Sequence, residues 1–263
     1  MASRGRRREP ARNGSRPASG RARARRNGPP VRVPHPLGAA ELPVKSAAPP
    51  GAARELAGLR YARRMTHGAR PQPNGDYLDR LMRRESFAAL WPLFAKATKP
   101  AKELTESYSA LVHLRPYMKK GSPCRVLHVG DGAHARTGAL FALKSESENI
   151  SIDPLLNLPL LEAWRSEFDI RHLSLRKAPI ERVTDELNAL PEMPVLVTFV
   201  HAHLHVDDVL DRLRWDFAFT LACCVPGHQL TRARVPLESG QDMSVLSEGR
   251  EFQVLENRRS ARS

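Results

Sequence analysis

The first fifty residues of this chain contain no Phe, Trp, Tyr, Ile or Cys. Without these side chains a segment cannot bury enough apolar surface to fold, so we expect it to be disordered. The 263 residues include three cysteines, Cys124 and the adjacent pair Cys223 and Cys224, too few for a disulfide framework. A reducing, intracellular setting is therefore expected.

Long apolar runs are also missing. No stretch reaches the about 18 apolar residues that a membrane-spanning helix needs. The first thirty residues have no apolar segment between a charged start and a cleavage site, which excludes a typical secretory signal. We therefore predict no membrane partner and no secretion.

Acidic residues are scarce in one part of the chain. The first 100 residues carry 22 Lys and Arg against 6 Asp and Glu, whereas residues 101–263 carry 20 against 22. The overall charge of +14 therefore belongs to the N-terminal part, and the remainder is nearly neutral and long enough for one domain. We predict a disordered Arg/Pro-rich arm and linker over 1–75, a helical lead-in over 76–120, an α/β domain over 121–256 and a disordered tail over 257–263.

Arginine dominates the arm. Eleven arginines and one acid, Glu9, lie between Arg4 and Arg32. Guanidinium groups bind phosphate through paired hydrogen bonds, so residues 4–32 are expected to contact nucleic acid, RNA above all, or to direct nuclear import. A nuclear or cytoplasmic location follows. Two alternatives remain, an organellar transit peptide and a solvated tail.

The apolar pattern changes along the rest of the chain. Helical spacing predicts a helix over 76–97, kinked or divided at Pro92, and another over 101–114. Beyond residue 120, short apolar runs alternate with helical patterns. The expected strands are 124–129, 149–153, 170–175, 194–200 and 217–225, and the expected helices are 135–143, 155–168, 180–190 and 207–213.

A hairpin is expected at the end of the chain, from segments 243–247 and 251–255 around Glu248-Gly249. Five β/α units followed by a hairpin predict an α/β fold. Its sheet would be open, mostly parallel and Rossmann-like, with a terminal antiparallel hairpin.

Ligands in such sheets bind beyond the carboxyl ends of the strands. Gly130, Asp131 and Gly132 follow the first predicted strand, and Asp153 ends the second, 23 residues after Gly130. The glycines allow a tight turn and close approach of a ligand. An acid at this distance can accept hydrogen bonds from ribose hydroxyls, so the pattern favours a nucleoside-containing ligand.

This pattern resembles the class I S-adenosylmethionine-dependent methyltransferases over residues 100–256. The resemblance implies that Gly130, Asp131 and Gly132 line the cofactor and that Asp153 holds its ribose. The loop departs from the family, which has three alternating glycines where VGDGAHAR has two. A dinucleotide-binding dehydrogenase and a purely structural glycine turn, with Asp153 capping the next helix, are the alternatives.

A cluster of histidines follows the fourth predicted strand. His201, Asp208 and the later segment Ala222 to Pro226 are similar to a methyltransferase subset that includes some tRNA 2′-O-methyltransferases. That resemblance implies that His201 acts as a general base and that Asp208 orients it. Zinc binding by the histidines with Asp208 and a thiolate is a second interpretation, and simple packing of these residues is a third.

Together these patterns predict an S-adenosylmethionine-dependent methyltransferase, with RNA as one candidate acceptor and the arginine-rich arm for nucleic-acid contact or targeting. The alternative is a non-enzymatic RNA-binding or virion-associated protein that keeps a degenerate Rossmann-like scaffold.

Overall fold

The computed structural model describes residues 73–118, 121–222 and 226–257. The predicted arm before residue 73, the tail beyond residue 257, and Cys223 and Cys224 lie outside the described residues. Within the described part, no helix is both long and apolar enough to cross a membrane.

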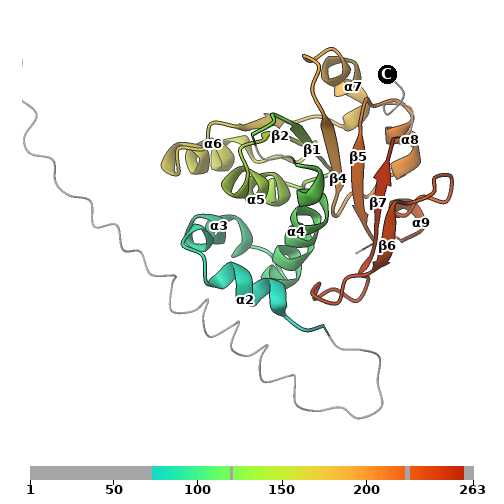
Figure 1. Ribbon diagram of the computed structural model, residues 1–263. Helices are drawn as coiled ribbons and strands as arrows, with labels where there is room; N and C mark the ends of the chain where they lie inside the picture. Colours follow the sequence, from blue (N-terminus) through green and yellow to red (C-terminus); the bar gives the residue numbers. More distant parts are fainter. Residues whose placement is uncertain (1–72, 119–120, 223–225, 258–263) are drawn as a thin grey trace, which may run out of the picture. The chain divides into compact units, whose positions relative to one another are not determined.

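A single sheet organises the described residues, with strand order β3-β2-β1-β4-β5-β7-β6. The first five strands run parallel, and β7 pairs antiparallel with both β5 and β6 (Figure 1). This confirms the predicted α/β sheet with an antiparallel edge. The strands are β1 (Arg125–Val129), β2 (Glu148–Ile152), β3 (Leu173–Arg176), β4 (Val195–Phe199), β5 (Phe217–Leu221), β6 (Glu238–Gln241) and β7 (Glu251–Glu256).

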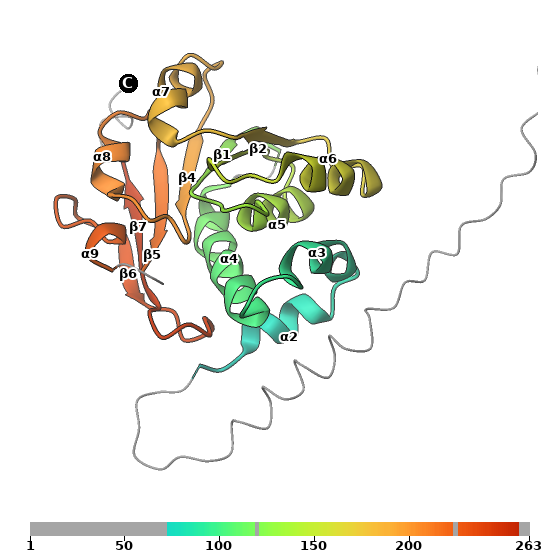
Figure 2. The same ribbon diagram turned by 180° about the vertical axis from the view of Figure 1, so that it is seen from behind.

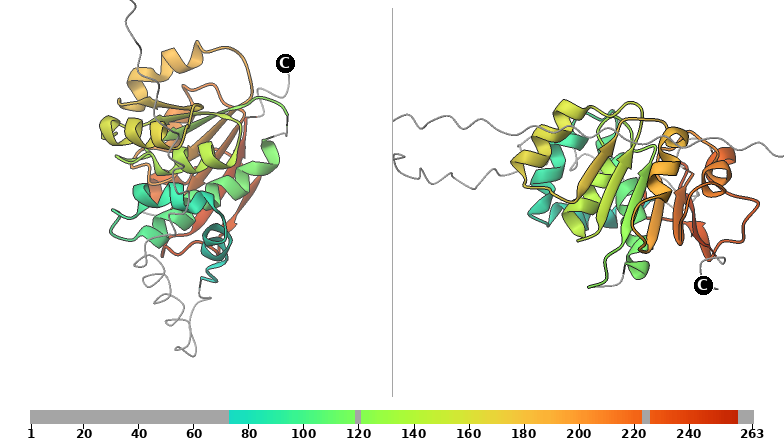
Figure 3. Two further views of the ribbon diagram at one scale, coloured as in Figure 1. Left: turned by 90° about the vertical axis from the view of Figure 1, so that its left-hand side faces the viewer. Right: turned by 90° about the horizontal axis from the view of Figure 1, so that it is seen from above.

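Helices cover both faces of the sheet (Figures 2 and 3). Alternate residues of a strand point to opposite faces, and both faces of β1 and β4 are buried, as expected for central parallel strands. Val126 of β1 packs in one core and Leu127 in the other. The helices are α2 (Asp76–Met82), α3 (Ser86–Phe94), α4 (Pro100–Leu114), the short 3-10 helix η2 (Arg115–Tyr117), α5 (Arg136–Lys144), α6 (Leu158–Glu167), α7 (Ile180–Asn188), α8 (Val206–Leu210) and α9 (Pro226–Gln229).

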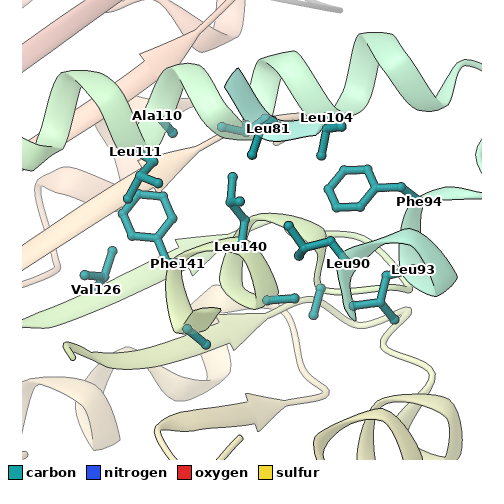
Figure 4. Close-up of a cluster of buried hydrophobic side chains, with 14 of the residues drawn as sticks. Leu81, Leu90, Leu93, Phe94, Leu104, Ala110, Leu111, Val126, Leu140 and Phe141 are labelled. Carbon is teal, nitrogen blue, oxygen red and sulfur yellow. The ribbon is translucent and has the colours of Figure 1, made fainter. Parts of the chain in front are cut away.

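The larger core joins the lead-in helices to the sheet. Figure 4 shows Leu90 and Phe94 of α3, Leu104 of α4 and Leu140 of α5 converging on one buried cluster. All four side chains are at most 1% exposed. Residues 76–114 are therefore an integral layer of the domain, and α4 packs against α5 and β5.

Two local predictions are wrong. The first helical segment divides at residues 83–85 rather than at Pro92, which lies inside α3, and a kink at Pro92 stays a prediction. The first arm of the hairpin is Glu238–Gln241 rather than 243–247. All four residues of β6 are exposed, so this edge strand carries no apolar pattern, whereas Val245 in the following turn is buried and mimics a strand residue.

Asp242, at the end of β6, holds the hairpin to the lead-in helices. Its Oδ2 accepts hydrogen bonds from Tyr77 Oη (2.7 Å) and Ser109 Oγ (2.6 Å), and His113 Nε2 lies 3.3 Å away. Burial alone would raise the pKa of Asp242, but the hydrogen bonds from His113, Ser109 and Tyr77 outweigh it and lower the pKa to about 2.

A fully buried histidine links the three central strands. His128 of β1 places Nδ1 2.9 Å from Thr198 Oγ1 on β4 and Nε2 3.1 Å from Asn149 Oδ1 on β2. Asn149 Nδ2 donates to the Ser147 carbonyl, so its Oδ1 faces the ring as an acceptor. A neutral ring protonated at Nε2 satisfies both contacts, and burial lowers the pKa of His128 accordingly.

Candidate functional site

The loop after β1 requires glycine at its first position. Gly130 has a φ of +71°, in the left-handed region. A Cβ there would lie 2.8 Å from Cα of Ala202, in the segment that follows the neighbouring strand β4. Both the backbone conformation and the close approach of the two loops therefore exclude a side chain at this position.

Asp131 holds this loop against α5 and β2. Its carboxylate accepts the N–H groups of Thr137 (2.8 Å) and Gly138 (2.9 Å) and the hydroxyl of Ser151 (2.7 Å). A Cβ on Gly138 would lie 2.0 Å from Ser151 Oγ, so α5 can pack this closely on β2 only with glycine there. Asp131, predicted to line the cofactor, thus directs its carboxylate toward the helix and β2.

Asp153, just after β2, contacts the glycine loop directly. Its Oδ2 accepts the N–H of Gly132 (2.9 Å), and its Oδ1 accepts the N–H of Leu155 (2.7 Å). The residue is 8% exposed. The structure therefore brings together the glycine loop and the second-strand acid at the carboxyl ends of β1 and β2.

These residues fit an adenosyl cofactor. Gly132 has a φ of +69°, and no other atom lies within 4 Å of the place where its Cβ would be, so the loop is open at this point. Each oxygen of Asp153 accepts one backbone N–H and retains a second acceptor position, which suits the two hydroxyls of a ribose.

His201 follows β4 at the same edge of the sheet, with a φ of +61° that few non-glycine residues adopt. Its Nε2 lies 2.9 Å from Oε2 of Glu106 on α4. Glu106 is fully buried, and Lys102 Nζ lies 2.9 Å from its other oxygen. Within the described residues, the Glu106 oxygens make no hydrogen bond of normal geometry. The buried carboxylate of Glu106 is therefore flanked by an ammonium group and an imidazole.

Glu106 is the site residue that sequence reasoning missed. The signal was the polar run Thr105-Glu106-Ser107 within a helix whose neighbours pack in the core; all three of these side chains are buried. Asp208, predicted to orient His201, lies exposed on α8. The carboxylate that the structure places beside His201 is that of Glu106.

The remaining histidines of the cluster lie at the surface. His203 and His205 are exposed, and the ring of His205 lies 3.9 Å from that of His228 on α9. Among residues 73–118, 121–222 and 226–257, no three His, Cys, Asp or Glu side chains are arranged to hold a metal ion. The predicted zinc alternative also involved Cys223 and Cys224, which lie outside that part.

Arg136, at the start of α5, binds partners within the chain. Its guanidinium forms an ion pair with Glu103 of α4, and its Nε donates to the Leu93 carbonyl (2.8 Å). The group also lies over the ring of Phe94, 5.8 Å from its centroid. Arg136 therefore fastens α3 and α4 to the end of the glycine loop.

The strand order, with β7 inserted antiparallel between β5 and β6, and the glycine loop beside the acid after β2 define a class I methyltransferase-like fold. This arrangement differs from the dehydrogenase order, in which the sixth strand follows the fifth. No protein-family model and no curated protein matches the chain.

Solved structures with a similar fold include S-adenosylmethionine-dependent methyltransferases. The O-methyltransferase TomG from Streptomyces achromogenes is 12% identical, with a TM-score of 0.48, over 73% of this chain and 100% of TomG. An rRNA methylase from Streptococcus thermophilus is 13% identical, with a TM-score of 0.36, over 62% of this chain and 97% of that protein. The bifunctional kinase-methyltransferase WbdD is 21% identical, with a TM-score of 0.38; the match covers 59% of this chain and 38% of WbdD.

Proposed function

We propose that the protein is an S-adenosylmethionine-dependent methyltransferase that acts on RNA. The observation that supports it most is the hydrogen bond between Gly132 and Asp153 at the carboxyl edge of a sheet with this strand order. This contact places the glycine loop beside the Asp153 carboxylate, which can accept hydrogen bonds from ribose hydroxyls. Open α/β sheets bind their ligands at this edge.

In this proposal the loop and the second-strand acid hold the cofactor. The backbone of Gly130 and Gly132 approaches it closely, and Asp153 accepts hydrogen bonds from its ribose hydroxyls. When bound, the cofactor supplies an electrophilic methyl group on a sulfonium sulfur. The chain itself contributes position and exclusion of water, which are the main requirements of an in-line transfer.

His201 is the proposed general base for a hydroxyl acceptor. Its side chain is 27% exposed, so it is accessible from the edge of the sheet, while Glu106 behind it is fully buried. With Nε2 facing the Glu106 carboxylate, the neutral ring presents Nδ1 as the proton acceptor. Glu106 and Lys102 act as positioning residues, because they contact the histidine or its partner rather than the acceptor.

The arginine-rich segment is the proposed contact for RNA. Eleven arginines between Arg4 and Arg32 supply charge-assisted hydrogen bonds to phosphate, with no aromatic residue among them to stack on bases. Binding through this segment would be largely independent of sequence. It would weaken steeply as salt rises, because each neutralised phosphate releases counterions.

The proposal is tested with the full chain and cofactor labelled in the methyl group. Transfer is measured into a total RNA fraction and a total protein fraction in parallel. Label that enters RNA and is removed by ribonuclease supports the proposal. Label that enters only protein, or neither fraction, contradicts it.

A further inference from the structure

A cavity lies at the opposite, amino end of the strands. It has a volume of about 690 Å³, which is in the range of small-molecule sites. Its walls come from α2, α4, the end of α5 and the segments that lead into β1 and β2. Cys124 at this end and Gly130 at the other are six residues apart, about 20 Å along an extended strand, so this cavity is distinct from the site described above.

The polar lining of the cavity is mainly cationic. Arg84, Arg115 and Lys144 line it, against the single acid Glu146. Neither arginine forms an ion pair with another described residue. Lys144 donates a hydrogen bond to Ser86, and burial, together with the nearby Arg84, lowers the pKa of Lys144. The cavity therefore holds positive charge without matching negative charge, which favours an anionic ligand.

The apolar lining and the hydroxyl groups indicate which class of anion the cavity would bind. Leu81, Leu111 and Met118 form an apolar wall, and Tyr108 adds an aromatic ring that is only partly buried. Serine hydroxyls also line the cavity: Ser122 is one, Ser145 donates to the Phe141 carbonyl, and Ser147 Oγ lies 3.1 Å from Cys124 Sγ. A bare anion would leave the aromatic and aliphatic surfaces without a partner, whereas a ligand with an aromatic part, hydroxyls and a phosphate would match all three kinds of group.

We propose that this cavity binds a nucleotide-type small molecule, with its phosphates between Arg84 and Arg115 and its base against Tyr108. Arginine forms paired hydrogen bonds with phosphate oxygens, and an aromatic side chain stacks on any base. The site is independent of the proposed methyl transfer, because its residues lie at the other end of the sheet.

The test uses the full chain and isothermal titration with ADP and with pyrophosphate at a fixed salt concentration. The double variant Arg84→Gln/Arg115→Gln removes both guanidinium groups from the cavity. The control Arg80→Gln/Arg83→Gln makes the same charge change at two exposed arginines that do not line it. The arginine-rich segment is intact in all three chains, so its non-specific binding of anions is the same in each.

We expect the dissociation constant for ADP to rise at least tenfold in the cavity variant and less than twofold in the control. Tyr108→Leu should weaken the binding of ADP severalfold and leave the binding of pyrophosphate unchanged. The thermal midpoint of the variant checks that it is folded. If the cavity variant and the control lose the same affinity for ADP, the proposal is overturned, because the binding would then depend only on overall charge. Equal affinity of the parent for ADP and pyrophosphate would overturn the nucleoside part. A short RNA is titrated in the same way. If the cavity variant binds this RNA more weakly but binds ADP as the parent does, the surface binds nucleic acid instead.

Discussion

The two ends of the sheet differ in how their residues are constrained. At the carboxyl end, Gly130, Asp131 and Asp153 are fixed by one another and by Ala202, Gly138 and Ser151, so a side chain has little freedom to change. At the amino end, the cavity is lined by residues from four stretches of the chain, around Leu81, Tyr108, Cys124 and Lys144, and no single motif joins them. A motif in the sequence marks the first kind of site, and the second kind becomes visible only once the chain is folded.

The largest effect that we expect at the carboxyl end concerns His201. His201→Asn should keep the backbone, because asparagine tolerates a positive φ, and should remove the proton acceptor. Methyl transfer should fall by about 10²–10⁴-fold, the usual contribution of a general base. Turnover with labelled cofactor measures this.

The matched variant is His203→Asn, at an exposed histidine two residues further on, which should leave turnover unchanged. An His201→Asn protein that transfers methyl groups at the parental rate would remove His201 from the mechanism. Glu106→Gln should lower turnover less than His201→Asn does, because Glu106 acts through the histidine.

A pair of glycine variants compares the two ends directly. Gly130 and Gly121 have φ values of +71° and +77°, so alanine meets the same backbone strain at both. At Gly130 the new Cβ would also lie 2.8 Å from Ala202, whereas at Gly121, at the amino end, nothing lies within 4 Å. Gly130→Ala should therefore cost about 1–3 kcal/mol more of unfolding free energy than Gly121→Ala.

Urea denaturation of both proteins measures that difference. Equal losses would show that the carboxyl end relaxes around a methyl group, and the contrast between a tightly constrained end and a more open one would then fail.

Asp242 extends the comparison to the hairpin. Asp242→Asn should lower the unfolding free energy by about 2 kcal/mol, because the hydroxyls of Tyr77 and Ser109 would no longer donate to an ionised carboxylate. Because the folded pKa of about 2 lies below the unfolded value of about 3.9, this stabilisation is complete above pH 4 and disappears as the pH falls toward 2. Asp169→Asn, at an exposed acid, should change neither stability nor its acid dependence.

A smaller effect is expected between the two ends, at His128. Burial lowers the pKa of His128, so the unfolded chain binds a proton that the folded chain does not. The contribution of the neutral His128 to the unfolding free energy is full above about pH 6.5. It falls by up to about 1.4 kcal/mol for each pH unit below that. His128→Gln should flatten the loss between pH 7 and pH 5, and His203→Gln should not. An unchanged slope in His128→Gln would assign the acid response to other groups.

Much of the fold could be predicted from the sequence because it rests on local patterns. The apolar runs gave the five parallel strands, and helical spacing gave α4 to within one residue at its start. The exposed edge strand β6 has no apolar pattern and was placed too late in the chain. The division between α2 and α3 was assigned to Pro92, which the helix accommodates instead.

The site was predictable where chemistry follows spacing along the chain. Gly130, Gly132 and Asp153 lie together because parallel strands bring their carboxyl ends to one edge. Glu106 was not predictable in the same way, since its meeting with His201 spans 95 residues and depends on how α4 crosses the sheet. Asp131 shows the reverse case, a motif residue whose carboxylate serves the loop's own structure.

The most direct test of the cofactor site is calorimetric titration of the full chain with S-adenosylmethionine. We expect saturable binding that Asp153→Ala weakens at least tenfold. Glu181→Gln, at an exposed acid on α7, should leave that binding unchanged. Absence of binding at millimolar cofactor, or binding that is the same in a folded Asp153→Ala protein, would contradict the account and leave the fold without its proposed cofactor.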